Sequence, residues 1–148
     1  MFGELLTAML TPFDNNGVIN TPVISKLSKK LIKDGNDGIV LAGTTGESPN
    51  LSYEDREILY RTAREAIGEK GSIVAGTGTY STSETIRLSK QAKDCEVDAL
   101  MVVTPYYSKP SQEGIYSHFK AISEEVDLPI IAYNIPSRTS KLIEIDTL

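Results

Sequence analysis

GIVLAGTTGE, residues 38–47, joins an uninterrupted apolar run to a turn in which two glycines flank Thr44 and Thr45. Because the run does not alternate with polar residues, it is typical of a strand that is covered on both faces in a parallel sheet. Further runs of the same kind, rich in Val, Ile, Leu and Ala, occur at LLTAML (5–10), SIVAG (72–76), ALMVV (99–103) and PIIAYN (129–134). The sequence therefore predicts a sheet of five parallel strands.

Helix signals fill the intervals between these runs. The expected helix starts are Thr21 followed by Pro22, Ser52, Ser81 with Glu84 at capping-box spacing, and Ser111. Gly35 and Gly68 predict where the first two helices end. Residues 143–148 predict the opening of one more helix. The strands recur about every 31 residues, which is close to the length of a βα unit.

Two architectures use repeated βα units, an open doubly wound sheet and a closed eight-stranded barrel. GTGTYS (76–81) begins like a dinucleotide-binding loop, but it lacks the third glycine and a suitably placed ribose-binding acid. A complete barrel needs roughly 250 residues, and this chain has 148. We therefore expect an α/β fold that forms the N-terminal part of a (βα)8 TIM barrel, with about five strands and four helices. Residues 1–148 are expected to be a single incomplete barrel domain, truncated on its C-terminal side.

Composition and charge exclude several classes of protein. The net charge of -5 offers no basic stripe for nucleic acid. One cysteine cannot build a disulfide framework or a cysteine-based zinc site, and one histidine cannot build a multi-histidine metal site. The expected strand ends carry no histidine, so we expect no Ser-His-Asp triad. We interpret His118 and Cys95 as structural residues. With no membrane-length apolar run and no leader motif, we expect a cytoplasmic protein without metal, membrane or nucleic-acid partners.

Polar residues gather where the expected strands end, which is where active sites lie in βα barrels. They are hydroxyl groups and one cation: Thr44, Thr45, Thr77, Tyr107, Tyr133 and Arg138. Threonine hydroxyls and backbone N–H groups can hold a carboxylate, and a tyrosine phenol can carry protons. The set therefore favours an anionic keto or hydroxy acid as ligand. Threonine and tyrosine are also good strand formers, and we prefer that structural interpretation for Thr104 and Tyr106 taken alone.

Several segments along the whole chain resemble the dihydrodipicolinate synthase family, within the superfamily of pyruvate-dependent class I aldolases and lyases. They are TAMLTPF (7–13), GNDGIVLAGTTGESPNLS (35–52), AGTGT (75–79), MVVTPYYSKPSQEGIYSHF (101–119) and YNIPSRT (133–139). The superfamily also holds N-acetylneuraminate lyase and 2-keto-3-deoxy sugar-acid aldolases. The paired threonines of GTTGE, together with Arg138, favour the synthase family.

The resemblance implies a homo-oligomer, a dimer of dimers, that needs no cofactor. It implies that pyruvate, held as a lysine Schiff base, condenses with L-aspartate 4-semialdehyde on the route to diaminopimelate and lysine. By motif, Thr45 binds the pyruvate carboxylate, and Arg138 binds the carboxylate of the semialdehyde. Thr44, Tyr107 and Tyr133 form the catalytic proton relay, in which Tyr133 is the main proton donor and acceptor and Tyr107 reaches the neighbouring subunit.

The Schiff-base lysine of the family lies on the sixth strand, which has no counterpart in these residues. Lys109, Lys120 and Lys141 follow or lie on other elements, and nothing around them predicts the lowered pKa that a nucleophilic lysine needs. We therefore expect negligible turnover from residues 1–148 alone. A non-catalytic fragment, or one half of a split barrel that needs a partner chain, is the alternative interpretation.

Some family members bind lysine as a feedback inhibitor, and the resemblance places a candidate allosteric lysine site near Ser48, Glu84 and Tyr106. Tyr80 stands where those members have an asparagine. This replacement argues against lysine feedback.

Overall fold

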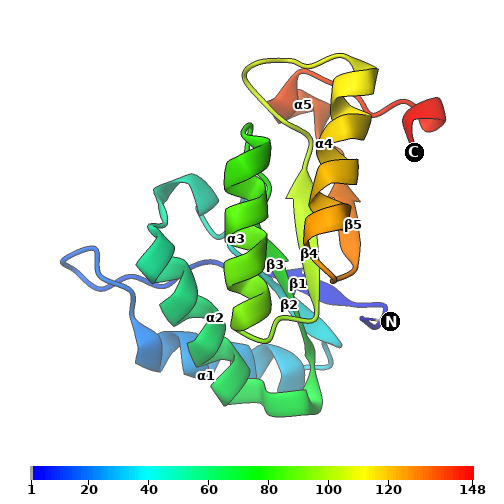
Figure 1. Ribbon diagram of the computed structural model, residues 1–148. Helices are drawn as coiled ribbons and strands as arrows, with labels where there is room; N and C mark the ends of the chain where they lie inside the picture. Colours follow the sequence, from blue (N-terminus) through cyan, green and yellow to red (C-terminus); the bar gives the residue numbers. More distant parts are fainter. Residues whose placement is uncertain (1) are drawn as a thin grey trace.

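The computed structural model describes residues 2–148 and contains a parallel sheet with strand order β1-β2-β3-β4-β5 (Figure 1). The strands are β1 (Leu6–Ala8), β2 (Gly38–Leu41), β3 (Ser72–Gly76), β4 (Ala99–Val103) and β5 (Ile130–Tyr133). The α-helices are α1 (Thr21–Lys33), α2 (Tyr53–Ile67), α3 (Thr82–Asp94), α4 (Gln112–Glu125) and α5 (Pro136–Thr139). Short 3₁₀ turns are η1 (Ser48–Asn50), η2 (Gly68–Lys70) and η3 (Ile145–Thr147). The expected α/β fold with parallel strands in chain order is confirmed.

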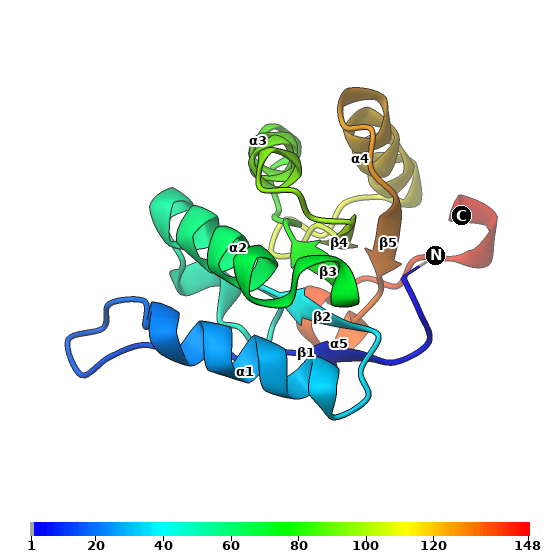
Figure 2. The ribbon, with the colours of Figure 1, turned by 90° about the horizontal axis from the view of Figure 1, so that it is seen from below.

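The long helices α1 to α4 lie on one side of the sheet, in an arc that follows the strands (Figure 2). The main core fills the space between them and includes Ile39, Ile73 and Leu100 from the strands. The other face of the sheet carries a smaller apolar cluster around Val40 and Val74. Apolar side chains therefore occupy both faces, as expected from runs without polar alternation.

The helix starts follow the predicted cap residues with one correction. Ser52 forms a complete capping box with Asp55, and Ser111 accepts a hydrogen bond from Gly114 N–H. Asn20, not Thr21, is the N-cap of α1, because its side-chain oxygen accepts from the Val23 N–H and places Thr21 inside the helix.

The capping box expected for Ser81 and Glu84 forms only in part. Ser81 Oγ accepts a hydrogen bond from the Glu84 N–H, while the Glu84 carboxylate binds the Arg87 guanidinium on the next turn. The helix end expected at Gly68 is confirmed, because this glycine is the C-cap of α2.

Some of the short elements differ from the expectations. The run 5–10 forms a strand of only three residues, Leu6–Ala8. Residues 143–148 form a single 3₁₀ turn, and the four-residue helix α5 was not expected. No helix within residues 2–148 combines the length and apolar character that a membrane span requires.

His118 and Cys95 are buried at 4% and 2% exposure, which agrees with their structural interpretation. His118 Nδ1 lies 2.9 Å from Thr82 Oγ1, so it links α4 to the start of α3. Its Nε2 atom is buried without a hydrogen-bond partner among the described residues. Burial lowers the pKa of the His118 imidazole, which favours the neutral ring at this position.

Candidate functional site

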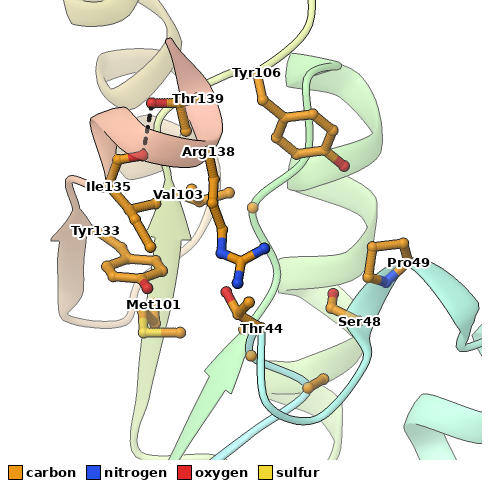
Figure 3. A pocket seen from close by; sticks show the side chains of 14 residues that line it. Thr44, Ser48, Pro49, Met101, Val103, Tyr106, Tyr133, Ile135, Arg138 and Thr139 are labelled. Carbon is orange, nitrogen blue, oxygen red and sulfur yellow. Dashed lines mark hydrogen bonds between the residues drawn. The ribbon is translucent and has the colours of Figure 1, made fainter. Parts of the chain in front are cut away.

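A cavity of about 330 Å³ opens at the carboxyl ends of the strands (Figure 3). Residues from the ends of four strands, β2 to β5, and from α5 form its wall. The lining residues are Ala42, Gly43, Thr44, Ser48, Pro49, Gly76, Gly78, Met101, Val103, Tyr106, Tyr133, Ile135, Arg138 and Thr139. This position agrees with the expectation that a βα barrel places its chemistry at the carboxyl edge of the sheet.

The turn of residues 43–48 forms the floor of the cavity and carries Thr44 and Thr45. Ala42, just before the turn, and Glu47, within it, have positive φ values of 51° and 55°. Non-glycine residues adopt this left-handed conformation at a cost in free energy. Gly46 is required for close approach, because a Cβ atom there would lie 3.1 Å from both the Met9 carbonyl oxygen and the Ala42 nitrogen. The turn is therefore tightly packed against the strand ends.

Two buried side chains hold this turn from different sides. Thr11 Oγ1 donates to the Gly46 carbonyl at 2.7 Å. Arg56 donates from Nη2 to the Ser48 carbonyl and to Ser48 Oγ, each at 2.8 Å. Both Thr11 and Arg56 are buried, at 5% and 4% exposure.

Arg138 reaches the cavity from α5. Its side chain extends into the middle of the cavity toward Thr44, with Tyr133 and Met101 on one side and Ser48 on the other (Figure 3). Among the lining residues within the described range 2–148, Arg138 is the one cation. A fixed guanidinium beside threonine hydroxyls suits a carboxylate ligand, because it can donate two parallel hydrogen bonds to the two oxygens.

The short helix α5 fixes Arg138 through the buried Thr139. Thr139 Oγ1 donates to the Ile135 carbonyl at 3.2 Å, a contact drawn in Figure 3, and lies 2.9 Å from the Lys141 carbonyl. Pro136 begins the helix, and the Arg138 N–H donates to the Ile135 carbonyl at 2.9 Å. Thr139 is 2% exposed, and its hydrogen bonds stay within residues 135–141, so it stabilises the turn from inside.

The structure brings three of the five residues expected to act on substrate into the cavity, Thr44, Tyr133 and Arg138. Thr45 is exposed on the same turn and is not part of the lining. Tyr107 points to solvent with 89% exposure and a positive φ of 68°. Tyr107 therefore lies free of the cavity within this chain.

The residues expected at a lysine-binding site lie beside the cavity and already have partners. Ser48 and Tyr106 line the cavity, and the Tyr106 ring packs edge-on against Tyr80 with centroids 5.6 Å apart. Burial raises the pKa of the Tyr106 phenol. Glu84 accepts from Arg87 Nε at 2.9 Å and Nη2 at 2.7 Å, and these hydrogen bonds lower the pKa of its carboxyl group.

Arg56 is the residue of this region that the sequence analysis did not identify. It lies on the inner stripe of α2 with Leu59, Tyr60 and Ala63, all of them buried. A charged residue at an apolar helix position was a usable signal, because arginine is almost never fully buried without partners. The partners themselves, Ser48 and Gly76, could not be read from spacing along the chain.

No lysine lines the cavity in the described part of the chain. Lys109 and Lys120 are exposed and Lys141 is half-buried, in agreement with their interpretation as surface cations. Residues 2–148 also contain no group of three or more His, Cys, Asp or Glu side chains that could hold a metal ion. The described residues therefore place a threonine hydroxyl, a phenol and a guanidinium at the cavity, but no lysine amine.

The fold and the cavity together define a protein of the βα-barrel class with a cavity at the carboxyl edge of its sheet. Comparison with known families identifies it further: the Dihydrodipicolinate synthetase family matches residues 1–148, and the chain belongs to this family. This confirms the resemblance deduced from the sequence motifs.

Relatives and solved structures agree with the assignment. A 4-hydroxy-tetrahydrodipicolinate synthase of Desulforudis audaxviator (strain MP104C) is 51% identical over 139 residues, which is 94% of this chain and 47% of the relative. The crystal structure of a dihydrodipicolinate synthase from Bacillus anthracis superimposes with a TM-score of 0.96 at 48% identity, covering 99% of this chain and 50% of that one. A dihydrodipicolinate synthase from Acinetobacter baumannii, solved in complex with pyruvate, gives a TM-score of 0.96 at 41% identity over 99% of this chain and 50% of that one.

The chain spans about half the length of the relatives and solved structures it matches. Their similarity confirms the expectation that these strands and helices correspond to the N-terminal part of a TIM barrel.

Proposed function

We propose that these residues are the substrate-binding and proton-relay half of a 4-hydroxy-tetrahydrodipicolinate synthase, a lyase that condenses pyruvate with L-aspartate 4-semialdehyde in diaminopimelate and lysine biosynthesis. The convergence of Thr44, Tyr133 and Arg138 on one cavity carries the proposal. Family membership supports it, as does the printed description of the Acinetobacter baumannii relative as a complex with pyruvate.

In this proposal the turn of residues 43–48 receives the pyruvate carboxylate. Thr45 binds the carboxylate, and exposed hydroxyl and N–H groups on a glycine-flanked turn support that role. Arg138 binds the carboxylate of the semialdehyde by a paired hydrogen bond. The cationic side chain in the middle of an otherwise uncharged cavity supports this assignment.

Protons move through Tyr133, Thr44 and Tyr107. Schiff-base formation joins an amine to the pyruvate carbonyl carbon and releases one water, so a proton carrier must stand beside that carbon. Tyr133 is the main donor and acceptor, and Thr44 stands across the cavity as its relay partner. Tyr107 completes the relay of a neighbouring copy of the chain in a homo-oligomer, and its 89% exposure supports a role outside its own cavity.

The amine comes from outside the described residues. No lysine lines the cavity within residues 2–148, and the relatives are about twice as long as the chain. We propose that the Schiff-base lysine belongs to sequence equivalent to the part of the relatives that this chain does not span. Residues 1–148 alone would then bind the keto acid without turning it over.

A non-catalytic half-barrel is a second candidate. The absence of a lysine from the cavity lining within residues 2–148 favours it. The two candidates differ in whether the cavity binds pyruvate.

The test combines a titration with covalent trapping. Pyruvate added to the 148-residue chain is expected to shift the amide NMR signals of Thr44 and Thr45, and Thr44→Val should weaken the binding. Borohydride reduction in the presence of pyruvate should leave the intact mass unchanged, while a relative of full length gains one reduced pyruvate. No shift in the wild-type chain would contradict the proposed binding role. A covalent adduct on one lysine of this chain would contradict the assignment of the amine to another part of the protein.

A further inference from the structure

Arg56 is a buried cation that has no carboxylate partner within residues 2–148. Its side chain is 4% exposed, and the ion pairs of the described residues do not include it. Its guanidinium instead binds neutral oxygens: the Ser48 carbonyl and Ser48 Oγ at 2.8 Å, the Gly76 carbonyl at 3.0 Å and the Tyr60 hydroxyl at 3.5 Å. A buried charge costs folding free energy unless hydrogen bonds compensate for its lost hydration. The four oxygen acceptors around Arg56 supply these hydrogen bonds.

The two carbonyl partners belong to the turn and to the strand beside it. Ser48 is the last residue of the turn that carries Thr44 and Thr45, and Gly76 is the last residue of β3. Both residues line the cavity. Arg56 therefore joins the end of the turn to the neighbouring strand from beneath the cavity.

The turn needs such a support, because its backbone departs from favoured conformations. Ala42 and Glu47 have positive φ values of 51° and 55°. The internal hydrogen bonds of the turn are long: Glu47 N–H to the Thr44 carbonyl and Ser48 N–H to the Gly43 carbonyl, both 3.2 Å. Strained backbone persists where the surrounding structure fixes it. Thr11 fixes the Gly46 carbonyl, and Arg56 fixes the other end at Ser48.

We infer that Arg56 is a positioning residue for the ligand site: its planar guanidinium clamps Ser48 to the end of β3 and so sets where Thr44 and Thr45 present their hydroxyl and N–H groups. The positive charge of Arg56, which forms no ion pair within residues 2–148, also favours an anion at the turn. The identity of the anion as a 2-oxocarboxylate rests on the proposed function. The clamp on the turn does not depend on the proposed function.

Lysine cannot replace this geometry. The guanidinium donates from Nη2 to Ser48 and from Nη1 to Gly76 in one plane, while a lysine ammonium is a single point charge on a flexible stem. Arg56→Lys should therefore keep the charge but loosen the clamp, and Arg56→Gln should remove both. The two variants separate the electrostatic effect from the geometric one.

Arg64 provides the matched control on the same helix. It lies two turns further along α2 and also binds carbonyl groups, those of Glu96 at 3.0 Å and Gly68 at 2.7 Å, together with the Asp98 carboxylate, all outside the lining of the cavity. Arg64→Gln therefore removes carbonyl hydrogen bonds and an ion pair without touching the turn.

The experiment measures amide hydrogen exchange and pyruvate binding by NMR in the 148-residue chain and in the three variants. In Arg56→Gln we expect the Glu47 and Ser48 amides to exchange roughly tenfold faster or more, because hydrogen bonds from a charged donor are lost. The exchange rates of the Ile39 and Val74 amides, which lie in the strands, should change by the same factor in Arg56→Gln and Arg64→Gln. Pyruvate affinity should fall about tenfold in Arg56→Gln and less in Arg56→Lys, and stay within about twofold in Arg64→Gln.

Each outcome decides the inference. The inference is overturned if the Glu47 and Ser48 amides of Arg56→Gln exchange at rates within twofold of those in the wild-type chain. It is also overturned if exchange becomes faster uniformly across the sheet and Arg64→Gln shows the same increase. If Arg56→Gln does not fold, Arg56→Lys decides by the same exchange comparison. If the wild-type chain binds no pyruvate, the proposed ligand is wrong, while the exchange data still decide whether Arg56 clamps the turn.

Discussion

Replacing Thr11 by valine removes one hydrogen bond from the turn of residues 43–48 and leaves the shape of the side chain almost unchanged. Thr11 Oγ1 donates to the Gly46 carbonyl at 2.7 Å, and Thr11 is 5% exposed. Valine has the volume of threonine but no hydroxyl group. The Gly46 carbonyl would therefore stay buried without this donor.

The expected loss of stability follows from that buried carbonyl. An unsatisfied buried acceptor costs about 1–3 kcal/mol, which is more than the net contribution of about 1 kcal/mol from an ordinary hydrogen bond. For a chain of about this length, 1 kcal/mol corresponds to roughly 2–4 °C in the melting temperature. We therefore expect Thr11→Val to lower the melting temperature by roughly 3–9 °C.

The assay is thermal and chemical denaturation of the wild-type chain, Thr11→Val and Thr11→Ser, followed by circular dichroism. Serine keeps the hydroxyl group and loses one methyl group, so Thr11→Ser should retain more of the stability than Thr11→Val. A Thr11→Val chain whose free energy of unfolding lies within about 0.5 kcal/mol of the wild-type value would refute the reasoning. It would mean that the turn finds another donor for the Gly46 carbonyl or does not need one.

Two further predictions concern charge and pH. The lowered pKa of buried His118 means that the folded state favours the neutral ring. The contribution of the neutral His118 ring to stability is therefore present above pH about 6.5, the usual pKa of histidine, and is lost as the pH falls below that value. The free energy of unfolding of the wild-type chain should decline as the pH falls, and it should decline less steeply in His118→Gln. Arg138→Gln should weaken binding of L-aspartate 4-semialdehyde about tenfold by NMR titration, because a paired charged hydrogen bond is lost. Arg87→Gln, which removes an exposed arginine outside the cavity lining, should leave that affinity unchanged, and equal losses in the two variants would count against Arg138 as a ligand-binding residue.

The parts of the fold that were predictable are those that local sequence specifies. SIVAG and ALMVV coincide with β3 and β4, because uninterrupted apolar runs can be buried only in a covered strand. Ser52 and Ser111 cap α2 and α4 as expected, since a cap needs only a side-chain oxygen before the first turn. The cap expected at Thr21 was wrong by one residue, because the neighbouring Asn20 also carries a side-chain oxygen and it is Asn20 that accepts from the Val23 N–H.

The features that escaped prediction depend on contacts between distant residues. The helix α5 has four residues, too few for any periodicity, and it is held by Thr139 through tertiary packing. The positive φ values of Ala42 and Glu47 arise because the turn fits between strand ends, and neither residue type predicts them. Thr44, Tyr133 and Arg138 were identifiable because each lies at or after the carboxyl end of a strand, and parallel strands bring these ends together.

The cavity combines exposed groups that can meet a ligand with buried groups that hold them in place. Thr44 and Arg138 are exposed, while the residues beneath them, Thr11, Arg56 and Thr139, are almost fully buried. Each buried group binds a main-chain carbonyl, so it fixes the backbone and leaves the ligand-facing side chains free. Preorganisation of this kind lowers the cost of ordering a site when a ligand binds. Loss of one buried support is therefore expected to weaken ligand binding even though every ligand-facing side chain is kept.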